Sequence, residues 1–267
     1  MNQHSHNFGD LLRTWRTRRR MSQLDLASEA EVSQRHLSFV ESGRAAPSRD
    51  MVLKLSEHLD VPLRERNQLL LAAGFAPSYG ERPLGDPSLD AARKAVDLVL
   101  TGHEPNPAIA VDRHWNMVAA NASIAPFLEG VADLKLLEPP VNVLRLSLHP
   151  KGLAPRIINL AEWRAHLLER ISRLIEATGD PVLEALETEL ATYPGGVTKT
   201  RIVHDETSRI VHPLRIRAGD TVLSFISTIT VFGTPLDVTL SELAIESFFP
   251  ADEATRQALL QLNSASA

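Results

Sequence analysis

The stretch SQLDLASEAEVSQRHLSFVESGR, residues 22–44, decides how the N-terminal part of this chain folds. Ser22 followed three residues later by Asp25 is typical of a capping box, which begins a helix. The dipeptide at 31–32 interrupts the helical pattern, and Ser33 can cap a second helix. Two short helices joined by a tight turn form a helix-turn-helix, whose second helix enters the major groove of DNA.

The second expected helix places polar side chains near its start, opposite an inward face made by Leu37 and Val40. Gln34 and Arg35 can form paired hydrogen bonds with the edges of adenine and guanine. Phe39, one turn further on, could meet a thymine methyl group or pack against protein. The alternative for all of them is an ordinary solvated helix face. The expected DNA contacts are Gln23, Ser33, Gln34, Arg35, Ser38, Phe39 and Arg44.

Two of these residues are expected at the DNA backbone. Gln23 lies at the start of the first helix, where its side chain and the backbone amides suit a phosphate oxygen. Arg44 follows the second helix and can also reach the backbone. The arginine run at 18–20 adds positive charge, although such a run is more often a solvated face.

The flanking sequence resembles the XRE family of lambda-repressor-like domains, which have five helices in about 70 residues. The matching positions are Arg16, Ser22-Gln23, Leu26-Ala27, Val32-Ser33, Glu41-x-Gly43 and Pro47-Ser48. The resemblance implies that Arg16 and Glu41 pair and tie the first helix to the recognition helix. Glu31 departs from the family, which usually has Gly there, and a left-handed non-Gly residue costs roughly 1–2 kcal/mol.

Charge is divided unequally along the chain. The net charge is −5, yet residues 1–75 hold 11 Arg and Lys against 9 Asp and Glu, a net charge of +2. The remainder holds 17 against 24, a net charge of −7. The positive charge is thus concentrated where a phosphate backbone would need it, and the acidic part is poorly suited to nucleic acid.

Composition excludes several classes of protein. The 267 residues are 43% hydrophobic and 23% charged, with no cysteine, so disulfides and thiolate metal sites are excluded. We find no apolar run of 18 residues, no signal-peptide core, and none of the common catalytic motifs. We therefore expect a cytoplasmic protein that is not an enzyme and needs no cofactor. Six histidines lack ligand spacing, so no metal site is expected: His4, His6, His149, His166, His204 and His212.

The rest of the chain predicts an α+β domain after a connector rich in proline and glycine at 74–90. We expect a helix at 89–101, strands at 109–111 and 114–119, a short helix capped by Asn121, helices within 161–192, and a hairpin at 208–232 that turns at Gly219-Asp220. The segment at 237–250 suits a strand or a helix. Such an order resembles a PAS-like sensor domain, with about five strands and helices between the second and third.

Four longer stretches resemble the MmyB-like transcription regulators: AGFAPSYGERPL, PAIAVDRHWNMVAANA, NVLRLSLHPKGLAPRIINLAEWR and FGTPLDVTLSELAIESFFPAD. In that family an XRE-type domain is joined to a PAS-like ligand-binding domain, and the resemblance implies a hydrophobic ligand, with fatty acids favoured. The expected domains are a helix-turn-helix domain at 1–73, a linker at 74–90 and a PAS-like domain at 91–267.

Candidate ligand contacts combine aromatic and cationic side chains: Trp115, Arg145, His149, Arg156, Trp163 and Phe225. The aromatic residues could equally be ordinary core. Arg145 is the first choice for holding a carboxylate, ahead of His149 and Arg156. Each of the three could instead be a surface side chain.

These patterns together predict a sequence-specific transcription regulator that binds double-stranded DNA as a homodimer on paired half-sites and senses a small hydrophobic ligand. No membrane contact is expected. In the alternative, the second domain mediates only dimer or protein-partner contacts, with no small ligand.

Overall fold

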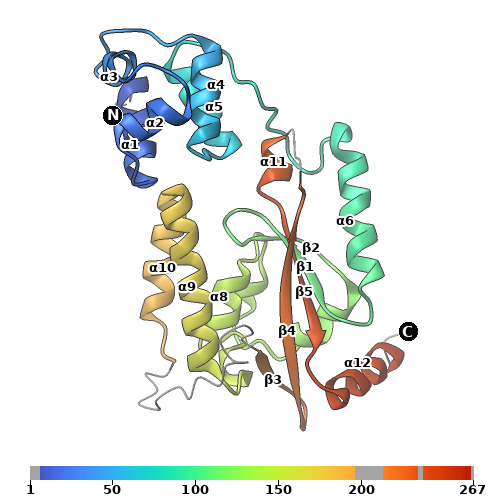
Figure 1. Cartoon of the computed structure of the whole chain (residues 1–267). Helices are drawn as coiled ribbons and strands as arrows, with labels where there is room; N and C mark the ends of the chain where they lie inside the picture. Colours follow the sequence, from blue (N-terminus) through green and yellow to red (C-terminus); the bar gives the residue numbers. More distant parts are fainter. Residues whose placement is uncertain (1–6, 196–212, 234–236, 266–267) are drawn as a thin grey trace. The chain divides into compact units, whose positions relative to one another are not determined.

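The computed structural model describes residues 7–195, 213–233 and 237–265 (Figure 1). The chain divides into two compact units, one built on Met1–Pro83 and the other on Leu84–Ile175, Gly179–Gly233 and Glu242–Ala267. The division at 83–84 falls inside the segment expected as a connector. Within the described residues, no helix is long and apolar enough to cross a membrane.

The first unit is a bundle of short helices. They are α1 (Phe8–Arg18), α2 (Gln23–Glu29), α3 (Gln34–Glu41), α4 (Arg49–His58) and α5 (Leu63–Ala72). The hydroxyls of Ser22, Ser33 and Ser48 cap α2, α3 and α4, because each accepts a backbone N–H three residues later. The expected capping box at Ser22 and Asp25 is present in full.

Two backbone features set how closely these helices pack. Glu31 has a φ of 50°, so the turn between α2 and α3 is left-handed without the glycine that such a turn prefers. Gly9 lets α1 approach α3, since a Cβ atom there would lie 2.3 Å from the carbonyl oxygen of Glu41. On α2, Leu26 and Ala27 form the buried apolar face, whereas Leu24 is 59% exposed.

The second unit is α+β, with a five-stranded antiparallel sheet in the order β2-β1-β5-β4-β3. The strands are β1 (Ala108–Val111), β2 (Met117–Ala120), β3 (Leu214–Ala218), β4 (Thr221–Val231) and β5 (Ala244–Pro250). The longer helices are α6 (Asp90–Gly102), α9 (Leu160–Thr178), α10 (Pro181–Thr192) and α12 (Glu253–Ala265). Short helices α7 (Ala125–Leu128) and α8 (Val143–Leu148) lie between β2 and α9, and α11 (Val238–Ser241) clusters with the first unit. This is the PAS-like arrangement that was expected.

Both faces of the sheet are covered, which is why all four residues of β1 are buried. Ala108 and Ala110 pack on the side of α6, whereas Ile109 and Val111 belong to the larger core that includes residues of α8, α9 and α10 (Figure 1). Alternate residues of a strand point to opposite faces, so small residues meet α6 and branched ones meet the larger core.

Three local expectations differ from the structure. The second strand begins at Met117, because Trp115 has a φ of 66° and the Asp112 carboxylate binds the backbone amides that follow it. Asn121 occupies the capping position before the short 3-10 helix Ala122–Ile124, but its side chain makes no capping bond. The side chain instead accepts from Ala108 N and donates to the carbonyls of Leu100 and Asn106. The helix α12 was not expected. Positions 208–212 of the expected hairpin lie outside the described residues.

Candidate functional site

The start of α3 presents its polar side chains to solvent, while Leu37 and Val40 face the core. Gln34 and Arg35 are exposed in the first turn. Ser33 is the cap of this helix, and its hydroxyl accepts the amide of His36 at 3.2 Å. The structure therefore presents at one helix end the side chains that suit base edges.

The guanidinium groups of two arginines lie over the ring of Phe39. The Arg35 group lies 5.4 Å from the ring centroid and the Arg44 group 5.7 Å. Cation–π attraction of this kind restricts long side chains that would otherwise be mobile. Phe39 is half-buried, and its carbonyl accepts the Arg44 amide at 2.8 Å, so it orients both arginines.

Glu41 lies behind this surface, at the centre of a buried polar cluster. Arg16 binds it with two hydrogen bonds, at 2.6 Å to Oε1 and 3.0 Å to Oε2, and the Glu41 side chain has no exposed surface. Burial alone would raise the pKa of Glu41, but hydrogen bonds from Arg16 and Gln23 and the charges of Arg16 and Arg13 hold the pKa below its ordinary value. The pairing of Arg16 with Glu41 is as expected.

Gln23, an expected contact of the DNA backbone, has a partner within its own domain. Its amide nitrogen donates to Glu41 Oε2 at 2.7 Å, so the side chain helps to satisfy the buried carboxylate.

The second unit contains an apolar cavity, here called the inner cavity, of about 110 Å³ between the sheet and helices α7, α8 and α9. Two of the candidate ligand contacts, Trp163 and Phe225, are among its walls, and Trp115 is not. Trp163 donates its indole N–H to Ser147 Oγ at 3.0 Å. The further lining residues are Pro107, Ile109, Met117, Ile124, Phe127, Leu128, Val143, Leu144, Leu146, Leu153, Leu167, Leu214, Ile216, Glu246 and Phe248.

Glu246 is the charged side chain among these walls. It is 4% exposed and pairs with Arg170 at 3.1 Å. Arg170 lies over Trp115, with its guanidinium carbon 4.1 Å from the ring centroid. Trp115 thus supports the ion pair behind the cavity. Glu246 was not among the expected site residues. The sequence signal for it is a single carboxylate within the otherwise mostly apolar strand β5.

Arg145 and His149 lie elsewhere, in a cluster formed with α10. Arg145 makes two hydrogen bonds of 2.7 Å to Glu189, which also accepts the Tyr193 hydroxyl. Burial, with the Glu189 hydrogen bond, raises the pKa of Tyr193 to about 12. His149 packs edge-on against Tyr193 at 5.0 Å. Neither Arg145 nor His149 lines the inner cavity, because partners on α10 and the chain after it hold them.

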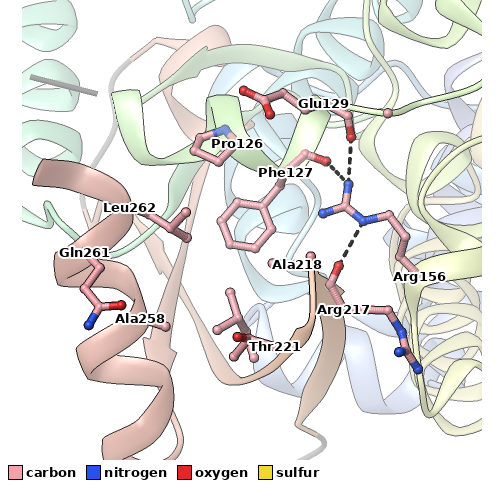
Figure 2. Close-up of a pocket in the computed structure, with 13 residues that line it drawn as sticks. Pro126, Phe127, Glu129, Arg156, Arg217, Ala218, Thr221, Ala258, Gln261 and Leu262 are labelled. Carbon is pink, nitrogen blue, oxygen red and sulfur yellow. Dashed lines mark hydrogen bonds between the residues drawn. The ribbon is translucent and has the colours of Figure 1, made fainter. Parts of the chain in front are cut away.

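Arg156 borders a second, larger hollow of about 760 Å³, here called the outer groove, between α7, the β3–β4 hairpin and α12 (Figure 2). Its guanidinium donates to the carbonyls of Phe127, Glu129 and Arg217 at 2.8, 2.9 and 3.0 Å. The other lining residues are Pro126, Gly130, Ala218, Gly219, Thr221, Leu223, Ala258, Gln261 and Leu262.

Among the residues that the structure describes, no group of three His, Asp or Glu side chains is placed to hold a metal ion. The polar clusters above are instead built from arginine–carboxylate pairs.

Two parts of the chain are similar to known protein families. Residues 92–262 match the family model of the MmyB-like transcription regulator ligand binding domain, and residues 12–66 match a helix-turn-helix model. A protein of Methanoculleus marisnigri, provisionally described as an HTH-type transcriptional regulatory protein, is 38% identical over 120 residues. That similarity covers 43% of this chain and 38% of the relative, so the chain spans well under two thirds of the relative's length.

Proposed function

Because this chain belongs to the MmyB-like transcription regulators, we propose that it binds specific DNA sites through α3 and regulates transcription in response to a small apolar ligand. The observation that carries the DNA proposal is the exposed pair Gln34 and Arg35 at the start of α3. Arg35 suits guanine and Gln34 suits adenine in the major groove. Arg44, next to Phe39, supplies a cation for the phosphate backbone.

The active form is proposed to be a homodimer. One helix-turn-helix buries a small interface on DNA, and a single unit seldom gives strong specificity. Two copies on half-sites about one helical turn apart double the contacts and make spacing part of the recognition. A ligand then alters DNA affinity by favouring one of two dimer arrangements.

The proposed ligand is fatty-acid-like and binds in the inner cavity. Support comes from the apolar side chains that line this cavity. An acyl chain would gain about 0.8 kcal/mol of binding free energy for each CH₂ group that it buries against them. In the competing proposal the second domain contacts only protein partners, and the inner cavity binds no ligand. Mass spectrometry of a denaturing extract of the purified chain separates the two, because a stoichiometric lipid supports sensing.

The DNA proposal is tested by selecting bound sequences from a random pool with the full chain. The double variant Gln34→Ala with Arg35→Ala should lose the preferred motif while keeping weak non-specific binding. Arg173→Ala is the matched control, since it removes one exposed arginine from α9. An unchanged motif in the double variant would reject the assignment of α3.

A further inference from the structure

The segment between strands β4 and β5 packs with the first unit, although both strands belong to the second. The first unit includes Thr234–Ser241 as well as the residues up to Pro83. The described part of this segment is residues 237–241, here called the clasp, which contain the short helix α11 (Figure 1). The chain therefore passes between the units at the clasp as well as at the junction of residues 83 and 84.

The clasp binds a stretch of chain, residues 78–82, that α5 holds in place. Asn67 of α5 is 8% exposed, and its Nδ2 donates to the Tyr79 carbonyl at 2.8 Å. Its Oδ1 accepts the backbone amides of Ser78 and Tyr79 at 2.9 and 3.1 Å. Because a buried amide side chain satisfies these backbone groups, residues 78–79 are fixed to α5.

Hydrogen bonds join the clasp to this stretch. Gly80 and Asp237 form a parallel bridge, and the Val238 amide donates to the Gly80 carbonyl at 2.7 Å. The Thr239 hydroxyl donates to the Arg82 carbonyl at 2.5 Å. A Cβ atom on Gly80 would lie 3.0 Å from Asp237 Oδ2, so the glycine permits this close approach. The clasp is thus bound to residues that are themselves bound to α5.

Hydrogen bonds within the clasp fix its shape. Asp237 is 8% exposed, and its Oδ1 accepts the Thr239 amide at 2.9 Å. The Asp237 carbonyl accepts the Ser241 amide at 3.1 Å. Val238 has no exposed surface. Close-packed and internally bonded residues shift as one body, so the clasp cannot move without disturbing its contact with residues 80–82.

Beyond Ser241 the chain leads into the middle strand of the sheet. β5 lies between β1 and β4 and pairs with both. Leu243, just before β5, is 2% exposed and packs in the core that includes residues of α6. Glu246 of β5 lines the inner cavity and pairs with Arg170. A displacement of this strand, which is bonded on both sides, would therefore act directly on the clasp.

We propose that the clasp is a second mechanical connection of the DNA-binding unit, which links β5 of the ligand domain to α5 and transmits displacements of β5. Coupling of this kind travels through packed and hydrogen-bonded residues that are contiguous, and such a path is present from Glu246 to Asn67. The clasp itself stands on the fold, and its use in regulation rests on the proposed function.

Hydrogen exchange of the full chain tests the contact. Val238→Ala truncates a side chain between two strands of the ligand domain, yet the amides of Ser78 and Tyr79 should exchange at least about tenfold faster. Val96→Ala is the matched control, because it truncates an equally buried valine of α6. It should leave those two amides protected. Unchanged protection in Val238→Ala, or equal loss in both variants, would overturn the proposal.

Crosslinking tests the same contact without weakening the core. The chain has no cysteine, and neighbouring strands lie about 4.8 Å apart, within the range that a disulfide spans. Gly80→Cys combined with Asp237→Cys should form a disulfide under mild oxidation. Gly80→Cys combined with Asp252→Cys, at the other end of β5, should not. Failure of the first pair to crosslink would overturn the proposal.

The role in regulation is tested by the dissociation constant for the selected DNA site, with and without dodecanoate, a saturated fatty acid. Val238→Ala should still bind both, but the effect of dodecanoate on DNA affinity should fall below about twofold. A full effect in this variant would overturn transmission through the clasp. If dodecanoate leaves the DNA affinity of the parent chain unchanged, the proposed sensing of fatty acids fails instead, and exchange and crosslinking still decide the clasp.

Discussion

Replacing Glu41 with alanine should strongly destabilise the N-terminal unit. The carboxylate is fully buried, and Arg16, which it binds at 2.6 and 3.0 Å, is 13% exposed. Without it the Arg16 guanidinium keeps one carbonyl acceptor, that of Met21 at 2.8 Å. Breaking a buried pair costs about 3–5 kcal/mol, and the residual exposure of Arg16 favours the lower end, about 3 kcal/mol.

Hydrogen exchange of the full chain measures this loss without separating the units. Amides in α1 and α3, such as those of Leu12 and Leu37, should exchange about a hundredfold faster, since about 1.4 kcal/mol corresponds to a factor of ten. Glu29→Ala, which removes an exposed carboxylate from α2, is the matched control. If Glu41→Ala leaves these amides protected and yet abolishes DNA binding, Glu41 acts in recognition and the structural assignment is wrong.

The same residue predicts an acid dependence. Burial opposes ionisation of Glu41, but the hydrogen bonds from Arg16 and Gln23 outweigh it, so the folded pKa lies below the ordinary value of 4.5. The stabilisation is therefore complete above about pH 4.5 and is lost as the pH falls through the lower folded pKa. In Glu41→Gln this part of the pH dependence of the unfolding free energy should disappear. If the unfolding free energies of the parent chain and of Glu41→Gln depend on pH in the same way, the assignment of Glu41 as a stabilising buried carboxylate is wrong.

Further predictions concern packing, base reading and the ligand. Gly9→Ala should cost about 1–3 kcal/mol of unfolding free energy, measured by urea denaturation, because its Cβ would lie 2.3 Å from the Glu41 carbonyl. Arg35→Ala should cost about 1–3 kcal/mol of DNA binding and relax one base position, and a variant with unchanged site preference would exclude base reading. Arg145→Ala should leave dodecanoate affinity unchanged, because Arg145 is bound to Glu189 outside both hollows, and a tenfold loss would return it to the site. Saturated fatty acids should raise the melting temperature with concentration, and a flat response at every chain length would reject them as ligands.

The sequence predicted the local elements of the N-terminal unit well because capping signals act over three or four residues. Ser22 with Asp25 and Ser33 marked the starts of α2 and α3, and both are present. The resemblance to the XRE family gave the pairing of Arg16 with Glu41, which lie 25 residues apart. That contact had no local signal of its own.

The ligand domain was predictable at the level of strand order and less so at the level of its cavities. Arg145 was expected to contact the ligand, but it pairs with Glu189, which is 44 residues further along the sequence. No local sequence pattern around Arg145 predicts that pairing. Phe127 lines both hollows, and no local pattern in the sequence indicates this, because the outer groove is formed by β3, β4 and α12 together. Such properties arise from long-range packing, which periodicity does not encode.

Ligand binding in one unit is proposed to change the DNA affinity of the other. The most direct measurement is the dissociation constant of the full chain for its selected site, with and without saturating dodecanoate. We predict a change of about fivefold or more in that constant, and an equal change in dodecanoate affinity when DNA is present, because linkage is reciprocal. A dissociation constant that stays the same while dodecanoate demonstrably occupies the chain would contradict the claim.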